Sequence, residues 1–161
     1  MKTAIVHPFP AFYDKDSKIL ILGSFPSVKS REQMFFYGHP QNRFWKVISK
    51  VFDEEVPEGI PEKKALLKRH HIALWDVIHS CEISGSSDSS ISDVVSNDLS
   101  EILETADIQK IIVNGKTAEK YYRKYIEPVT KRTAICMPST SPANAAWSVE
   151  ALVGEWEKCV K

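Results

Sequence analysis

The sequence predicts an α/β fold, a three-layer α/β/α sandwich around a four-stranded, mainly parallel sheet. Four short apolar runs are nearly continuous rather than alternating, which is typical of strands buried on both faces. Segments with apolar residues at helical spacing separate these runs. Because strands and helices alternate, we expect layers joined by right-handed crossovers. The chain has 161 residues and is 43% hydrophobic, which suits one domain, residues 1–161, with a full core.

Each predicted strand is a run of mostly apolar residues followed by a residue that interrupts it. Gly23 follows the first run, Asp76 the second, Asn114 the third and Pro138 the last. The expected strands cover residues 19–22, 72–75, 111–113 and 134–137. Ligands of open parallel sheets bind outside the carboxyl ends of the strands, so we expect a site near these interruptions.

Four further segments place apolar side chains on one helical face. In the first of them, Phe44, Ile48 and Val51 share a face, and in the last, Leu152 and Trp156 do. The expected helices cover residues 44–52, 99–106, 118–125 and 149–160. The Gly- and Ser-containing stretch 84–90 is the main loop within the domain.

Charge and hydropathy restrict the classes of partner. Formal net charge is zero, whereas nucleic-acid-binding proteins are often basic overall. A local patch is enough, however, and Lys29, Arg31, Arg43 and Lys46 gather in or near the first of two polar loops, residues 23–43. No apolar run approaches the roughly 20 residues that cross a bilayer, and Pro8 comes too early for a signal-peptide core. We therefore expect a cytoplasmic monomer with no membrane segment.

The cysteines argue against a metal centre. Cys81, Cys136 and Cys159 are odd in number and show no CxxC spacing, so a disulfide framework is disfavoured. Three thiols do not supply the usual four ligands of an iron–sulfur cluster, and their wide spacing disfavours zinc. We expect buried, unreactive thiols, no metal and no cofactor.

Two polar loops, residues 23–43 and 137–144, carry groups that suit cleavage of an N-glycosidic bond in DNA. In that reaction the sugar gains oxocarbenium character and the leaving base gains negative charge, after the base has been flipped out of the duplex. The pocket needs an aromatic plate, donors to the base and a group that holds water. Tyr37 or Phe36 offers the plate, the N–H groups of Ser24 and Phe25 are donors, and the Asn42 amide can orient water.

Other residues of these loops suit contacts with substrate or with DNA phosphates. Hydroxyl groups can hydrogen-bond a sugar or phosphate, and cations neutralise phosphates. We expect the substrate to be bound by Ser24, Phe25, Tyr37, His39 and Ser139. We expect DNA to be bound by Ser27, Lys29, Arg31, Lys116, Ser141 and Asn144.

Three motifs give the chain a resemblance to the uracil-DNA glycosylase superfamily. They are Gly23-Ser24-Phe25-Pro26, His39-Pro40-Gln41-Asn42-Arg43-Phe44-Trp45-Lys46-Val47 and Met137-Pro138-Ser139. The middle motif is similar to a stretch of mismatch-specific uracil/thymine glycosylases. Over its whole length the chain resembles the deoxyinosine (hypoxanthine-DNA) glycosylase branch. The resemblance implies a monofunctional enzyme that hydrolyses deoxyinosine in DNA, releases hypoxanthine and leaves an abasic site.

One departure from the mismatch-specific pattern concerns the catalytic amide. Those enzymes carry an Asn in the first loop, where this chain has Phe25. In the deoxyinosine branch the essential Asn lies in the His-Pro-x-Asn segment, so Asn42 is the implied catalytic residue. The base-stacking aromatic falls on Tyr37, and Ser139 stands where standard uracil glycosylases have a His. The resemblance thus implies a site that accepts a larger purine base.

Several residues of the first loop also have a structural explanation. Asn42 precedes a helical segment and fits an N-cap, which would engage its side chain with the first helical N–H groups. Phe25 and Tyr37 can be packed aromatics of the core. His39 can shape the turn before Pro40.

The polar residues that come later in the sequence also have both a structural and a functional explanation. Residues 139–141 can be a capping cluster for the C-terminal helix. Asp76 can position loop backbone or contact a base. Pro142 and Ala143 are poor wedges by size, so the sequence assigns no residue to fill the duplex after flipping.

Three other functions fit parts of the pattern. The first is a mismatch-specific uracil/thymine-DNA glycosylase. The second is a non-catalytic nucleic-acid-binding module on the same fold, which the replacement of the first-loop Asn by Phe25 keeps open. The third is a hydrolase of free nucleosides or nucleotides.

Overall fold

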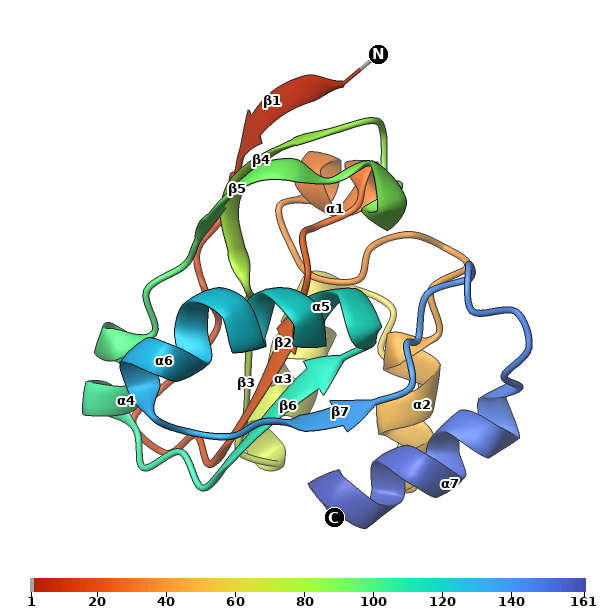
Figure 1. Cartoon of the computed structure of the whole chain (residues 1–161). Coiled ribbons are helices and arrows are strands. Elements are labelled where there is room, and N and C mark those ends of the chain that lie inside the picture. Colours follow the sequence, from red (N-terminus) through yellow and green to blue (C-terminus); the bar gives the residue numbers. More distant parts are fainter. Residues whose placement is uncertain (1) are drawn as a thin grey trace.

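A computed structural model describes residues 2–161 and confirms the predicted three-layer α/β/α sandwich (Figure 1). Its central sheet has four strands in the order β3-β2-β6-β7, and each neighbouring pair is parallel. All four predicted strands are present, with ends that differ by at most one residue. They are β2 (Ile19–Gly23), β3 (Ile72–Asp76), β6 (Lys110–Asn114) and β7 (Ile135–Met137).

Helices cover both faces of this sheet. On one face lie α2 (Phe44–Val51), α3 (Ile60–Arg69) and α7 (Val149–Val160). On the other lie α4 (Ser100–Thr105) and α5 (Lys116–Tyr121). Four of these match the predicted helical segments, whereas α3 has a polar sequence and buries few of its residues.

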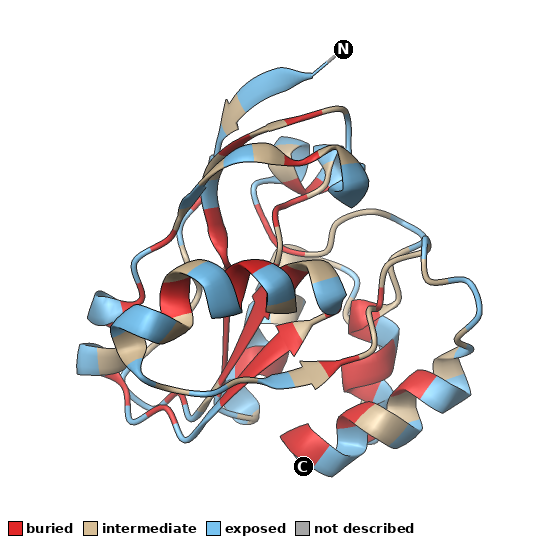
Figure 2. Cartoon of the chain, viewed as in Figure 1, coloured by how far each residue is buried: buried red, intermediate tan, exposed pale blue. Residues whose placement is uncertain are grey.

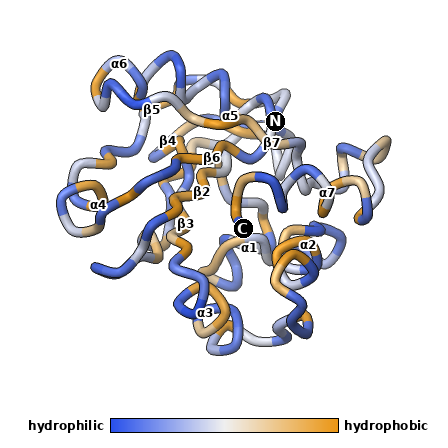
Figure 3. The backbone as a smooth tube through the Cα atoms, turned by 90° about the horizontal axis from the view of Figure 1, so that it is seen from below, coloured by the Kyte–Doolittle hydropathy of each residue, from blue (hydrophilic) through white to orange (hydrophobic). Residues whose placement is uncertain are grey.

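Residues that alternate along β2 point into two separate cores. Ile21 packs into the core beneath α2, α3 and α7, and Leu20 and Leu22 pack into the core beneath α4 and α5. All three side chains are fully buried, as Figure 2 shows for the middle of the sheet. Seen from below, the hydrophobic strands β2 and β6 lie between α5 on one side and α2 on the other (Figure 3). Burial on both faces explains why the strands read as continuous apolar runs.

The helix predicted over residues 118–125 is part of a longer, irregular one. After α5 the chain forms a π-helical turn, Tyr122–Ile126, and then α6 (Glu127–Thr130). Pro128 lies in the first turn of α6, where its missing N–H and its ring disfavour the regular bond to the carbonyl four residues earlier. This explains why the helix changes to the i→i+5 hydrogen bonds of a π-helix just before Pro128.

A second, antiparallel sheet is absent from the sequence prediction. It has the order β1-β4-β5 and contains β1 (Thr3–Val6), β4 (Ile78–Ile83) and β5 (Ser92–Ser96). Only Val77 separates β3 from β4, so the chain passes directly from one sheet to the other. This step carries the loop at residues 84–90, with its short 3₁₀ turn Asp88–Ser90, toward the carboxyl ends of the parallel strands.

The remaining helix, α1 (Val28–Gln33), lies within the first polar loop. Ser27 caps it by accepting a hydrogen bond from the Ser30 N–H, and Met34 ends it in the left-handed conformation. Within residues 2–161, every helix is too short or too polar to span a bilayer.

Trp156 on α7 anchors the loop that follows β7. Its ring is fully buried and meets Phe44 edge to face, with centroids 6.1 Å apart. Its indole N–H donates to the Pro138 carbonyl at 3.0 Å. The C-terminal helix thus holds both the core and one wall of the sheet's carboxyl end.

We predict that Trp156→Ala lowers the free energy of unfolding by about 3–5 kcal/mol, because it opens a large cavity and removes the donor to Pro138. Chemical denaturation followed by circular dichroism measures this change. Val129→Ala is the control, since Val129 is 76% exposed, and it should change stability by less than about 0.5 kcal/mol. A similar loss in both variants would contradict the anchoring role.

Candidate active site

The last residues of the four parallel strands line one cleft. These residues are Gly23, Asp76, Asn114 and Met137. The cleft has a volume of 1020 Å³, at the upper end of the range of about 300–1,000 Å³ that is usual for small-molecule sites. It lies at the carboxyl edge of the sheet, where parallel sheets bind ligands.

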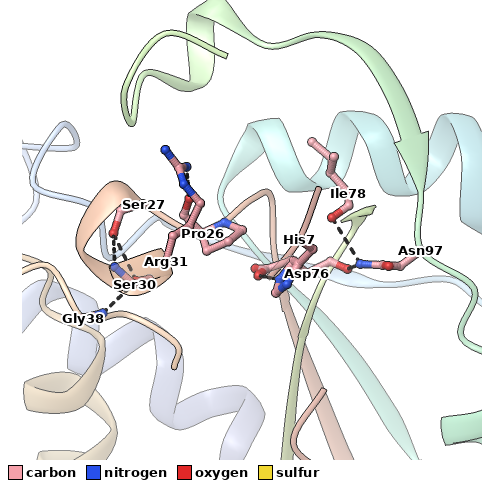
Figure 4. A network of polar contacts seen from close by, with 9 residues as sticks. All are labelled: His7, Pro26, Ser27, Ser30, Arg31, Gly38, Asp76, Ile78 and Asn97. Atoms are coloured by element: carbon pink, nitrogen blue, oxygen red, sulfur yellow. Dashed lines mark hydrogen bonds and ion pairs between the residues drawn. The ribbon is translucent and has the colours of Figure 1, made fainter. Parts of the chain in front are cut away.

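Most of the predicted site residues border this cleft. They are Ser24, Phe25, Ser27, Tyr37, His39, Asn42, Lys116, Ser139, Ser141 and Asn144. Lys29 and Arg31 lie outside its lining: Lys29 pairs with Glu32 on the exposed side of α1, and Arg31 donates to the Pro26 carbonyl at 2.8 Å (Figure 4). The role of either cation in DNA binding stays a prediction.

Asn42 has two hydrogen-bond partners inside the protein. Its Oδ1 accepts from the Phe44 N–H at 2.9 Å and from the Thr140 hydroxyl at 2.9 Å. The N-cap of α2 is Arg43, so Asn42 lies one residue before the predicted cap position, but its side chain still satisfies the free N–H of Phe44 at the start of the helix. The residue also borders the cleft, so its structural and its proposed catalytic position coincide.

Thr140 links Asn42 to the end of β6. Its side chain is fully buried, and its Oγ1 accepts from Asn114 Nδ2 at 3.0 Å. Its own N–H donates to Asn114 Oδ1 at 3.1 Å. Sequence analysis expects ligand contacts from Ser139 and Ser141 and gives helix capping as the alternative for residues 139–141, but it assigns Thr140 no contact in the site. The structure corrects the capping alternative, since Ser148 caps α7 by accepting from the Ala151 N–H.

Arg43 also holds the loop after β7 in place. Its guanidinium donates to the carbonyls of Ser141 at 2.9 Å and Asn144 at 3.0 Å, and also to that of Trp147. Its backbone N–H donates to the Thr140 carbonyl at 3.0 Å. The positive charge of Arg43 is therefore engaged with backbone oxygens. The guanidinium suits this role because its five N–H donors have a fixed, planar geometry.

Tyr37 stacks on the core side of the cleft. Its ring lies on Phe44 with centroids 4.1 Å apart, and its φ of 54° places it in the left-handed region. The next residue is held by Ser30, whose buried hydroxyl accepts the Gly38 N–H at 2.9 Å (Figure 4). Packing against Phe44 confirms the structural alternative for Tyr37, whereas base stacking stays a prediction.

The Tyr37 hydroxyl is buried, and within residues 2–161 it has no hydrogen-bond partner. Burial raises the pKa of this hydroxyl far above its ordinary value, and the Asp76 carboxylate adds to the shift. The group therefore stays protonated near neutral pH. Gly23 passes close by, and a Cβ at Gly23 would lie 2.5 Å from Asp76 Oδ1 and 3.1 Å from the Tyr37 oxygen. Only glycine leaves room for these two polar groups.

A buried pair, His7 and Asp76, lies beneath the cleft. His7 Nε2 and Asp76 Oδ2 are 2.7 Å apart, and Figure 4 shows them beside Asn97. The Asn97 amide donates to the Asp76 carbonyl at 2.8 Å. The Asp76 carboxylate oxygen accepts, so Nε2 carries the donated proton, and His7 Nδ1 has no partner among the described residues. Asp76 thus has a structural contact and still borders the cleft.

Asp88 stands at the rim, where Ser24 Oγ donates to its Oδ1 at 3.0 Å. The enclosing walls raise the pKa of Asp88, Asp76 raises it further, and hydrogen bonds from Ser24 and Thr117 oppose the shift. Sequence analysis does not single out Asp88 or Thr117 as site residues. A short polar loop between two undetected strands gives no signal of where its side chains point.

Several predicted hydroxyl and imidazole groups hold turns within the loops. Ser139 Oγ accepts from the Ser141 N–H, and Ser141 Oγ accepts from the Ala143 N–H, both at 3.1 Å. His39 Nδ1 accepts from the Gln41 N–H at 3.1 Å, so His39 shapes its turn as the structural alternative predicts. These groups stiffen the rim of the cleft, and their contacts with a ligand stay predictions.

Phe25 is both a packed core residue and a residue of the cleft wall. Its ring is 8% exposed and belongs to the core beneath α4 and α5, yet it borders the cleft. In residues 2–161 no intramolecular hydrogen bond uses the N–H of Ser24 or of Phe25. Two residues that border the cleft therefore have backbone donors without a partner in the described part of the chain.

Comparison with known proteins identifies the class that this fold and cleft define. The family model of the uracil DNA glycosylase superfamily matches residues 10–158. The chain belongs to this superfamily. The match spans both polar loops and all four strands of the central sheet.

Individual relatives narrow the comparison. A protein of Methanosarcina acetivorans named hypoxanthine DNA glycosylase is 36% identical over 154 residues, covering 92% of this chain and 94% of its own. One with the same name from Methanosarcina barkeri is 31% identical over 159 residues, covering 95% and 96%. The solution NMR structure of a proposed uracil DNA glycosylase from M. acetivorans superposes with a TM-score of 0.82 at 33% identity, covering 97% of each chain.

We predict that Arg43→Lys destabilises the protein by about 2–4 kcal/mol, because one ammonium group cannot donate to the carbonyls that the guanidinium now bridges. Thermal unfolding and limited proteolysis within residues 138–147 measure the effect. Arg123→Lys is the matched control, since Arg123 is exposed and forms an ion pair with Glu119 one helical turn away. Equal behaviour of the two variants would show that Arg43 does not hold the loop.

Proposed function

We propose that this protein is a monofunctional DNA glycosylase that hydrolyses the N-glycosidic bond of deoxyinosine in DNA. The products are hypoxanthine and an abasic site. One observation carries the proposal: Asn42 borders the cleft. It lies in the segment His39-Pro40-Gln41-Asn42, where the resemblance to hypoxanthine-DNA glycosylases places the catalytic Asn. The two Methanosarcina relatives, which align over more than nine-tenths of the chain, bear the corresponding name.

The cleft offers a flipped purine suitable partners. The free N–H groups of Ser24 and Phe25 suit the carbonyl oxygen of hypoxanthine, and the Phe25 and Tyr37 rings offer apolar contact. In the reaction, water adds a hydroxyl group to the sugar carbon and the bonding electrons leave with the base, which finally gains a proton. Donors around the base stabilise the charge that it develops.

DNA would lie across the mouth of the cleft. Lys116 stands exposed at the rim, and Ser27, Ser141 and Asn144 border it. These residues suit phosphate contacts, which position the duplex without reading its sequence.

Uracil release is the second candidate, favoured by the fold and identity shared with the NMR structure. Uracil also presents a carbonyl beside a ring N–H, so it fits the same donors. Release of uracil opposite guanine that exceeds release of hypoxanthine would select it.

We expect wild-type protein to release hypoxanthine from a duplex oligonucleotide with one deoxyinosine. Asn42→Ala should lower the single-turnover rate by about 100-fold or more, the loss typical of a preorganised catalytic amide. Alkaline cleavage of the abasic product measures the rate. Gln109→Ala is the control, because Gln109 is exposed next to β6 at the opposite end of the sheet from the cleft.

Other outcomes would select other functions. DNA binding without release of either base would favour a binding module. Hydrolysis of free inosine at a rate that DNA does not improve would favour a nucleoside hydrolase. Hypoxanthine release that survives Asn42→Ala would leave Asn42 with a structural role only, through its bonds to Phe44 and Thr140.

A further inference from the structure

The Asn42 amide is oriented by a backbone N–H that can only donate and by a hydroxyl whose proton is free to be donated. The Phe44 backbone N–H is only a donor, so the atom 2.9 Å from it has to be the amide oxygen. The Thr140 hydroxyl accepts from Asn114 Nδ2, and its single proton is therefore free to be donated to the same oxygen. A flipped amide would place two donors against each other at Phe44 and would leave the Thr140 proton without this acceptor.

This arrangement fills the acceptor capacity of Asn42. A carbonyl oxygen has two lone pairs, and Phe44 and Thr140 engage both. Nδ2, in contrast, donates to no group within residues 2–161, and it is not among the buried atoms that lack a partner. Since Asn42 borders the cleft, its two free N–H bonds are presented there.

We infer that Asn42 acts on the substrate as a hydrogen-bond donor to the departing base, and that Thr140 and Asn114 are positioning residues that orient its amide. The inference rests on the proposed glycosylase function and replaces an acceptor role toward water. As the bond between the sugar carbon and the base breaks, its electron pair moves onto the base. The Nδ2 donors stabilise that charge on a ring nitrogen or carbonyl oxygen.

Thr140 and Asn114 form a chain of hydrogen bonds that holds the Asn42 amide in the orientation that a donor role requires. Thr140 is fully buried, so its hydroxyl exchanges no bond with water. Asn114 is engaged through both ends of its amide, with Nδ2 to Thr140 Oγ1 and Oδ1 to the Thr140 N–H. The end of β6 thereby fixes the direction of a side chain at the start of α2.

Asn42→Asp separates a donor from an acceptor. The aspartate keeps an oxygen for Phe44 and Thr140 and is an equally good residue before a helix, so the fold is retained. It turns an anionic oxygen toward the cleft in place of the N–H groups. We expect hypoxanthine release to fall by about 100- to 1,000-fold, at least as far as in Asn42→Ala.

If Asn42 instead accepts a proton or hydrogen bond from water, the carboxylate is the stronger acceptor. Asn42→Asp would then release hypoxanthine at or above the wild-type rate, and that result would overturn the inference. Failure of wild-type protein to release any base is a different outcome, which would remove the proposed function itself.

Binding to a duplex with a tetrahydrofuran abasic-site analogue tests where the donor acts, because this duplex lacks the base. We expect Asn42→Asp and wild type to bind it within about threefold of each other. Weakened binding that matches the loss in rate would mean that Asn42 contacts a phosphate, and it would overturn the assignment to the base.

Thr140→Val and Thr140→Ser test the positioning chain. Valine has the shape of threonine without the hydroxyl, so the amide loses the bond that fixes it, and we expect a roughly 10- to 100-fold slower release. Serine restores the hydroxyl and should recover most of the rate. Equal rates for the two variants at equal folded fraction, measured by circular dichroism, would overturn the role of Thr140.

Discussion

The buried hydrogen bonds around Thr140 determine how the two halves of the cleft meet. Its hydroxyl joins the start of α2 to the loop after β7, and its backbone pairs with Asn114 at the end of β6 and with Arg43. These segments are 26 and 98 residues apart along the chain. Because a buried polar group without a partner costs about 1–3 kcal/mol, the three segments stabilise one mutual arrangement. The shape of the cleft follows from it.

The central sheet was predictable because its strands are buried on both faces. Ile19 to Leu22 reads as a strand without knowledge of any neighbour, and so do the other three runs. The antiparallel sheet was not predictable in this way. In β1, Thr3, Ala4 and Val6 are exposed, and β5 alternates between half-buried and exposed residues, so neither carries a strong apolar pattern. The polar α3 escaped prediction for a related reason, since it buries only Leu66 and Leu67.

The site was predictable as a set of loops and less so as a set of contacts. Motif spacing brought Ser24, Asn42 and Ser139 to one cleft, because parallel strands end at a common edge. Spacing could not show that the Asn42 oxygen is shared between Phe44 and Thr140, since that depends on how distant segments pack. It also could not place Arg43, whose charge faces backbone carbonyls although it lies among cations near the first loop.

The hydrogen bonds of Arg43 within the protein affect how many counterions the protein can displace when DNA binds. A cation that is already matched by carbonyl dipoles displaces few counterions from a phosphate. Of the residues that border the cleft within the described part of the chain, Lys116 alone is a lysine or arginine. The logarithm of DNA affinity falls with the logarithm of salt concentration in proportion to the phosphates neutralised. For a protein of zero formal net charge with one cation at its cleft, we therefore expect enclosure of the base to contribute more to recognition than charge does, and the affinity for DNA to depend weakly on ionic strength.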